Sequence, residues 1–367
     1  MKQYIVVGAG ILGATTAYKL AKSGTKVLII DKQGIGQATE AAAGVICPWL
    51  SQRRNKAWYH LAKNGARIYP ELIKELEEDG ITETGYAQVG AISLHQDEGK
   101  ILAMKERALK RREDAPEIGE ITILNPEETR NLVPIIAEGY AAVHISGAGR
   151  VDGSLFRNAL IRAAEKHGAK FIEGEAILSP TGQAVTVNGE TYEADKIIAA
   201  CGAWMNEFLA PLGIDFQSTG QKGQLIHLQL QNMDSSTWPV MIPPTSQSIV
   251  PFENHFVVGA THEDDVGFDH RITAGGVHTI LTKAIEVFPE LANSTFLGAK
   301  VGFRPFTPGY LPVIGELPAN EQILVANGLG SSGLTTGPFV GIQLAKLALG
   351  KELDISLEDY DILGAIN

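Results

Sequence analysis

The first thirty residues alternate between short apolar runs and a helical pattern. Residues 2–7 form a continuous apolar run typical of a buried parallel strand, and a second run, 27–30, ends at Asp31. Between them lies a segment of helical length, 12–23, which ends at Gly24. The pattern predicts a strand–helix–strand unit whose two strands are parallel.

Further helices are predicted downstream. Residues 56–78 carry apolar side chains near one face of a long amphipathic helix, and 155–168 and 333–350 are also expected to be helical. The stretch 105–114 is so densely charged that we expect it to form the solvated face of a helix.

Strands are predicted where short apolar runs are bounded by turn residues. These runs are 85–95, 139–146, 170–172, 196–200, 225–230, 255–258 and 323–326. Asn188-Gly189 has the composition of a hairpin turn. The tight turn after 196–200 suggests that this strand returns to the first sheet, whereas the alternation between 224 and 303 favours an antiparallel sheet in a separate domain.

Together these elements predict an α/β fold with a discontinuous Rossmann-like nucleotide-binding domain. The second domain is expected to be an α+β substrate domain built on a mostly antiparallel sheet. We expect residues 1–85, 145–215 and 300–367 to form the nucleotide-binding domain, and 86–144 and 216–299 the substrate domain.

Composition narrows the functional classes. The chain has 367 residues, of which 44% are hydrophobic and 20% charged, as in a folded protein large enough for two domains. Its net charge of −11 gives a surface that repels phosphate backbones, so no nucleic-acid partner is expected. The uncharged run 4–18 is interrupted by glycines and is too short to span a bilayer, so no transmembrane segment is expected.

The chain contains two cysteines, Cys47 and Cys201, without CxxC spacing and without a Cys/His cluster. We therefore expect neither a disulfide framework nor a metal site, and a reducing, cytoplasmic location.

The turn between the first strand and the first helix reads Gly8-Ala9-Gly10-Ile11-Leu12-Gly13 and matches GxGxxG. The first glycine permits the tight turn, the second lets the backbone approach a pyrophosphate, and the third lets helix and strand pack closely. Asp31 ends the second strand, where its carboxylate is expected to bind ribose hydroxyls and to repel the 2′-phosphate of NADP. The turn predicts a dinucleotide, but by itself it fits NAD and FAD equally.

Three further segments distinguish these cofactors. They read Gly36-Gln37-Ala38-Thr39-Glu40-Ala41-Ala42-Ala43-Gly44, Ala194 to Trp204 with an A-x-G-x-W ending, and Gly302-Phe303-Arg304-Pro305-Phe306-Thr307-Pro308 through Gly315. In this order, and together with Gly328 to Thr335, they resemble the FAD-dependent D-amino-acid oxidase superfamily, which holds glycine oxidase, sarcosine oxidase and D-amino-acid dehydrogenase. The resemblance covers nearly the whole chain and implies FAD as the cofactor.

The resemblance also implies which residues contact the FAD. They are Gly8, Ala9, Gly10, Ile11, Leu12, Gly13, Asp31, Lys32, Ala38, Thr39, Ala42, Ala43, Gly44, Val45, Ala176, Ile177, Ala200, Gly202, Trp204, Arg304, Gly330, Ser331, Ser332, Gly333, Leu334 and Thr335. Thr39 is expected to bond a phosphate. Reduction leaves negative charge on the N1–C2=O edge of a flavin, and the backbone N–H groups of 330–334 are expected to stabilise it. The alternative is that these glycines only cap a helix.

Arg304 is the main candidate for substrate binding. In glycine oxidase and its relatives the arginine of this motif grips the substrate carboxylate, which implies a clamp that holds the substrate Cα–H over flavin N5. The alternative is an arginine paired with an acid at the domain interface. With a clamp, a neutral amine can pass hydride to the flavin and leave as an imine without a protein base.

Other positions depart from the family pattern. Glycine oxidase has a tyrosine where this chain has Ser248, and the T-P-D-G of the family becomes Thr307-Pro308-Gly309-Tyr310. Ser248 and His262 are candidate pocket residues, although a histidine in a strand is more often structural. Gly302 stands where sarcosine oxidases carry the cysteine that binds flavin, so non-covalent FAD is expected. Cys47 either approaches the ring or is a buried structural thiol.

The resemblance leads to an FAD-dependent oxidation of a small amine or amino acid, with oxygen or a quinone as electron acceptor. Chirality, substrate identity and oligomeric state, including a homo-oligomer, stay open. One rival is a glycine-oxidase-like module acting on modified tRNA, which the acidic charge and the lack of an attached methyltransferase region disfavour. Another is a non-catalytic FAD-binding protein, which the retained Arg304 disfavours.

Overall fold

The computed structural model describes residues 2–318 and 320–367. Its first layer is a six-stranded sheet formed by β1 (Gln3–Val7), β2 (Lys26–Asp31), β10 (Lys170–Glu173), β14 (Lys196–Ala199), β20 (Val313–Leu317) and β21 (Asn320–Asn327). Their order is β10-β2-β1-β14-β21-β20, and all neighbours are parallel except β20 and β21. The strand at 196–200 therefore returns to the first sheet, as the sequence predicts.

Helices cover one face of this sheet. They are α1 (Ile11–Lys22), α2 (Lys56–Glu78), α5 (Gly153–Lys166) and α8 (Gly333–Ala348). Alternate strand residues such as Tyr4 and Val6 point into this helical layer, whereas Ile5 and Val7 point to the other face. That second face is covered by α6 (Met205–Leu209) and a small sheet of β11 (Ile177–Leu178), β12 (Ala184–Val187) and β13 (Glu190–Glu193).

The second large sheet has nine strands. They are β3 (Gly36–Gln37), β6 (Ala91–His95), β7 (Ile121–Leu124), β8 (Ala141–Ile145), β15 (Thr219–Gln229), β16 (Val240–Ile242), β17 (Ser248–Pro251), β18 (Phe256–Gly259) and β19 (Thr295–Phe306). Their order is β3-β19-β15-β18-β17-β16-β6-β8-β7, and the pairs are antiparallel except β3–β19 and β6–β16.

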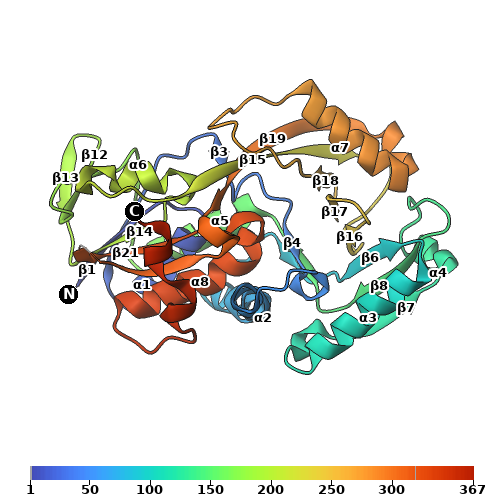
Figure 1. The fold of residues 1–367 in the computed structure, drawn as a ribbon, viewed down its shortest axis with the longest axis horizontal. Coiled ribbons are helices and arrows are strands. Elements are labelled where there is room, and N and C mark those ends of the chain that lie inside the picture. Colours follow the sequence, from blue (N-terminus) through green and yellow to red (C-terminus); the bar gives the residue numbers. More distant parts are fainter. Residues whose placement is uncertain (1, 319) are drawn as a thin grey trace.

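Three helices belong to this second region: α3 (Glu98–Arg112), α4 (Pro126–Leu132) and α7 (Ala274–Val287). A further small sheet, β4 (Val45–Ile46), β9 (Gly149–Val151) and β5 (Tyr86–Ala87), lies between the two regions. Figure 1 shows both termini in the lobe that holds α1 and α8, and α3, α4 and α7 toward the far end of the long axis.

The structure corrects the expected sequence of strands between 224 and 303, because α7 interrupts it. The segment is rich in glycine and β-branched residues, which have low helix propensity. Its helix is stabilised instead by the Thr273 N-cap, which accepts from the Gly276 N–H, and by Ile280, Ala284 and Val287, which pack on the sheet. Tertiary packing outweighs local preference here. The nine-stranded sheet also extends past residue 300, where the nucleotide-binding domain was expected to resume, because β19 runs to Phe306.

Candidate active site

A cavity of about 630 Å³ lies between the two large sheets, at the carboxyl ends of β1, β2 and β14. This is the edge at which open α/β sheets bind ligands. Expected cofactor residues in its wall are Gly8, Gly10, Ile11, Leu12, Asp31, Lys32, Ala38, Thr39, Ala42, Ala43, Gly44, Val45, Ala176, Ile177, Ala200, Gly202, Trp204, Arg304, Gly330, Ser331, Gly333, Leu334 and Thr335. Ser248 and His262 line it as well. The structure thus brings together segments that are up to three hundred residues apart.

Three expected residues are not in the cavity wall. Ala9 donates its backbone N–H to Asp31 Oδ2 at 2.6 Å, and a Cβ at Gly13 would overlap the carbonyl oxygen of Gly8. Ser332 Oγ accepts from Trp58 Nε1 at 2.9 Å, which ties the start of α8 to α2. These residues shape the site, and their direct contact with a cofactor stays a prediction.

The glycine turn is built for close backbone approach. Gly8 has φ +91°, and a Cβ there would overlap the carbonyl oxygen of Ala200 on the next strand. The N-cap of α1 is Gly10, which has no side chain to bond the helix N–H groups, and the first turn holds no acidic residue. Its free N–H groups and partial positive charge therefore face the cavity, as binding of a pyrophosphate requires.

Two side chains beside this turn, Asp31 and Thr39, already accept hydrogen bonds from other groups of the protein. Asp31 accepts from Ala9 N and Gln33 N, each at 2.6 Å, and from Gln37 Nε2 at 2.7 Å. A carboxylate has about four lone-pair sites, so about one remains for a ribose hydroxyl. Thr39 Oγ1 accepts from Ile11 N at 2.9 Å, which leaves the hydroxyl proton available to a phosphate oxygen.

A second helix start meets the same cavity. The 3-10 turn Gly330–Ser332 leads into α8, which also has no side-chain cap and no acidic residue in its first turn. Gly341 of α8 packs on the backbone of α1, where a Cβ would come within 2.7 Å of the Leu12 carbonyl oxygen. This close helix pair aims two helix starts at one cavity, and that arrangement fits a molecule with two separate anionic regions.

The loop after β2 lies against β19. Its β3 segment pairs with Gly302 and Phe303, and a Cβ at Gly302 would come within 2.7 Å of the Ala41 Cβ. A larger side chain at position 302 would push the small-residue loop away. The glycine where sarcosine oxidases have a cysteine is therefore also a packing requirement.

Arg304 projects from β19 beside the cavity. Its Nη1 donates to Gln221 Oε1 at 2.9 Å and to the Thr261 carbonyl at 3.0 Å, and Nη2 lies over Gly223 in the cavity wall. Within residues 2–318 and 320–367 it forms no ion pair. Burial lowers the pKa of its guanidinium, and Asp264 partly offsets this. A half-buried, permanently charged fork with free donors can bind a carboxylate.

Ser248 begins β17 and His262 follows the end of β18, and both line the same cavity as Arg304. Burial, followed by the charge of Arg304, lowers the pKa of His262, so the imidazole is neutral near pH 7. A neutral imidazole can accept or donate a hydrogen bond, and it carries no positive charge that would compete with Arg304 for the substrate carboxylate.

The cysteines are poor nucleophiles. Cys201 lines the cavity, and burial and the charge of Asp31 raise the pKa of its thiol. Burial likewise raises the pKa of Cys47 to about 12, and this residue is not in the cavity wall. Both thiols stay protonated at neutral pH.

Sequence reasoning missed several wall residues in the region of the nine-stranded sheet. Gly223 and Leu225 of β15 line the cavity, and so does Ser246, which precedes β17. These residues carry no motif, and only the register of the strands brings them to the site. In the described residues no helix is long and apolar enough to cross a membrane, and no group of three metal-ligating side chains is found.

The fold and the site define an FAD-dependent oxidoreductase. A family model described as DAO, FAD dependent oxidoreductase, matches residues 3–347, and the chain belongs to this family. The expected cofactor, family and fold class are confirmed.

Individual relatives cover nearly the whole chain. An uncharacterized oxidoreductase YurR of Bacillus subtilis (strain 168) is 55% identical over 100% of both chains. The crystal structure of iminodiacetate oxidase from Chelativorans sp. BNC1 is 40% identical with a TM-score of 0.94, covering 98% of each chain. That of glycine oxidase from Geobacillus kaustophilus is 27% identical with a TM-score of 0.85, covering 99% of each chain.

Proposed function

We propose that this protein oxidises a small amine that carries a carboxylate, such as a glycine derivative or another amino acid, to an imine. The observation that carries the proposal is Arg304, a guanidinium without an ion-pair partner in the described residues whose Nη2 lies at the wall of the flavin cavity. The rival role for Arg304, pairing with an acid at the domain interface, has no supporting contact among those residues.

In this mechanism the protein binds and orients. Arg304 holds the substrate carboxylate, and its own position is held by Gln221 and the Thr261 carbonyl. Neutral His262 and Ser248 lie close enough to the same pocket to contact the amine. When bound, FAD supplies the acceptor for a hydride from the substrate Cα at flavin N5. The substrate enters as a neutral amine, so no protein base is needed, and water hydrolyses the imine.

The relatives support this substrate class. The names of the iminodiacetate oxidase and the glycine oxidase each describe an amine with a carboxylate on the adjacent carbon. The smaller Ser248 in place of the tyrosine of glycine oxidase leaves room for a second substituent on nitrogen. We therefore rank N-substituted glycines, including iminodiacetate and sarcosine, ahead of glycine.

The test is anaerobic reduction of the flavin. Purified yellow protein is mixed in turn with iminodiacetate, sarcosine, glycine, proline and D-amino acids, and the absorbance of the oxidised flavin is followed. We expect rapid bleaching by at least one compound, and its loss in Arg304→Ala although FAD stays bound. Arg130→Ala, on exposed α4, is the matched control.

Each rival has its own readout in the same preparation. No bleaching by any amine supports a non-catalytic protein, and tight, salt-dependent RNA binding supports the tRNA alternative. Re-oxidation by oxygen with formation of hydrogen peroxide identifies an oxidase, whereas re-oxidation only by a quinone identifies a dehydrogenase.

A further inference from the structure

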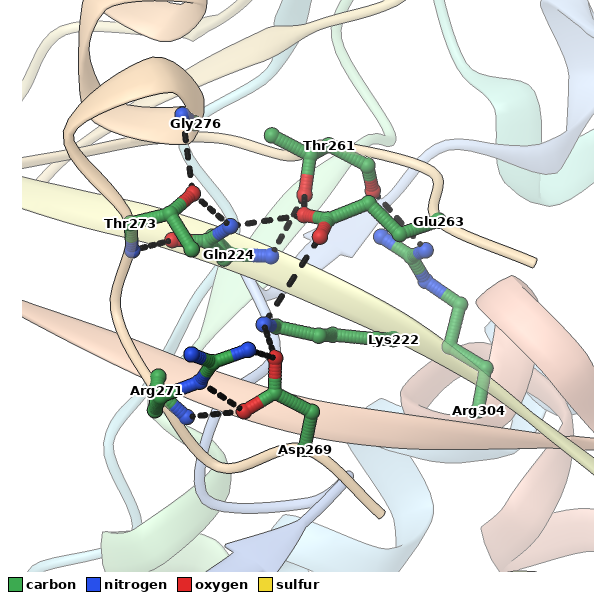
Figure 2. Close-up of polar contacts among 9 residues, drawn as sticks. All are labelled: Lys222, Gln224, Thr261, Glu263, Asp269, Arg271, Thr273, Gly276 and Arg304. Carbon is green, nitrogen blue, oxygen red and sulfur yellow. Dashed lines mark hydrogen bonds and ion pairs between the residues drawn. The ribbon is translucent and has the colours of Figure 1, made fainter. Parts of the chain in front are cut away.

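Behind Arg304 lies a buried charged cluster that the proposed reaction does not use. Lys222 of β15 is 0% exposed, and so is Gln224. Because strand residues alternate and Gly223 and Leu225 line the cavity, Lys222 and Gln224 point to the opposite face of the sheet. Figure 2 shows Lys222 between two carboxylates, with Arg304 on the other side of Thr261.

The ammonium group of Lys222 is paired with acids from one loop. Its Nζ lies 3.2 Å from Asp269 Oδ2 and 3.7 Å from Glu263 Oε2. Burying the ammonium group of a lysine costs free energy unless its charge is paired. Removing either the lysine or its carboxylate partners would therefore leave a buried charge without compensation. Arg271, which is largely exposed, also pairs with Asp269 at 2.8 Å.

The cluster connects to Arg304 through a short series of hydrogen bonds. Glu263 Oε1 accepts from Thr261 Oγ1 at 2.6 Å and from Gln224 Nε2 at 2.7 Å. Thr261 Oγ1 accepts in turn from the Gln224 backbone N–H at 2.9 Å. The carbonyl of the same Thr261 accepts from Arg304 Nη1. Thr261 therefore joins the buried cluster on one face of the sheet to the guanidinium on the other (Figure 2).

Charge balance gives Lys222 a role beyond packing. Glu263 is only two residues from the carbonyl that Arg304 contacts, yet it pairs with Lys222. Interactions with its hydrogen-bond donors and Lys222 lower the pKa of Glu263 against the effect of burial, so it is ionised. Without the ammonium, this buried carboxylate would keep only the neutral donors Thr261 and Gln224, and its charge would be left uncompensated beside Thr261.

We propose that Lys222 is a positioning residue for substrate binding: by pairing with Glu263 it holds Thr261 in place, and with it the carbonyl that orients Arg304 toward a substrate carboxylate. The inference rests on the proposed function, because it assigns Lys222 a task in the same clamp. The backbone bonds between Lys222 and Glu263, both at 3.0 Å, do not depend on the lysine side chain. Replacing that side chain therefore changes the charge while the strand pairing remains.

The experiment is a double-mutant cycle on holoprotein with full FAD content. The probes are acetate and its neutral analogue acetamide, titrated against the flavin absorbance spectrum, together with KM and kcat for the best substrate. Lys222→Met should weaken acetate binding and raise KM by about tenfold or more, the effect of disturbing a hydrogen bond to a charged group. Binding of acetamide should change by less than about twofold, because it carries no charge for Arg304 to select.

Two further variants separate charge from packing. Lys222→Met combined with Glu263→Gln removes both charges and keeps an acceptor for Thr261, so acetate binding should return toward wild type. In an Arg304→Ala background, Lys222→Met should have no further effect on acetate, because the coupled partner is gone. A merely structural role would instead give the same loss in both backgrounds and for both probes.

The outcomes are distinguishable. Wild-type acetate binding in Lys222→Met, together with a loss in Arg304→Ala, overturns the inference alone. Wild-type acetate binding in Arg304→Ala overturns the clamp and with it the inference. If Lys222→Met does not fold, Thr261→Val provides the test, since it removes the hydroxyl link without stranding a charge. Weakened acetate binding in that variant supports the proposal, and unchanged binding overturns it.

Discussion

Gln221 and Arg304 lie directly opposite each other in the β15–β19 pair, and the guanidinium donates to the Gln221 amide oxygen at 2.9 Å. The amide nitrogen of Gln221 donates in turn to Asp264 at 2.9 Å. A neutral amide therefore separates the arginine from the nearest acid of the loop. This arrangement orients Arg304 without neutralising it.

The first prediction concerns this orientation. Gln221→Leu removes the acceptor of a charged hydrogen bond, so KM for a carboxylate substrate should rise by about tenfold or more, with a smaller change in kcat. Steady-state kinetics measures both. Gln229→Leu, at the other end of the same strand, should leave KM unchanged. An unaltered KM in Gln221→Leu would show that the Thr261 carbonyl alone orients the guanidinium.

The second prediction uses two adjacent glycines in the first turn of α7. A Cβ at Gly276 would overlap the side-chain amide of Gln224, which three hydrogen bonds hold in place, whereas a Cβ at Gly275 meets nothing within 4 Å. Gly276→Ala should lower the free energy of unfolding by about 1–3 kcal/mol through overpacking. Gly275→Ala should leave it unchanged or raise it by up to about 1 kcal/mol through helix propensity.

Denaturant unfolding of both variants in parallel checks this pair. Equal stability of the two variants would show that the Gln224 side chain can move to accommodate the added Cβ without lowering the free energy of unfolding. The side chains of the Lys222 cluster would then be less rigidly held than their hydrogen bonds indicate.

The nucleotide-binding half of this protein could be predicted from the sequence. Its strands are continuous apolar runs, and its turns are specified by glycines such as Gly8, whose positive φ and lack of space require that residue. The substrate half was less predictable. Helix α7 forms although its residues have low helix propensity. The two acceptors of Arg304 are the Gln221 amide oxygen and a backbone carbonyl, and no sequence motif predicts either contact. Long-range strand pairing determines these contacts, and pairing is not a local property.

The third prediction is that FAD is released intact on denaturation. Cys201, which lines the cavity, is a protonated thiol because burial and Asp31 raise its pKa, and position 302 has no room for a cysteine next to Ala41. Acid precipitation in the dark should leave a colourless pellet and put all the flavin in the supernatant. A yellow pellet would contradict non-covalent binding, and loss of that colour in Cys201→Ala would identify the attachment site.

The last prediction concerns acid stability and His227 of β15. Its ring stacks on His255 with centroids 5.4 Å apart, and its Nε2 is buried without a hydrogen-bond partner among the described residues. Burial is the main cause that lowers the pKa of His227 to about 4; His255 and Lys300 act in the same direction and Asp152 opposes them.

In the unfolded chain a histidine titrates near about 6.5, so between that pH and about 4 the unfolded state binds the proton and the folded state does not. The contribution of His227 to stability is therefore present above about pH 6.5 and is lost as the pH falls toward 4. His227→Leu should show a smaller decrease in the free energy of unfolding between pH 7 and pH 5 than the wild type, measured by denaturant titration. His278→Leu, on the exposed face of α7, should keep the wild-type dependence. A His227→Leu variant with the wild-type slope would mean that other groups cause the acid sensitivity.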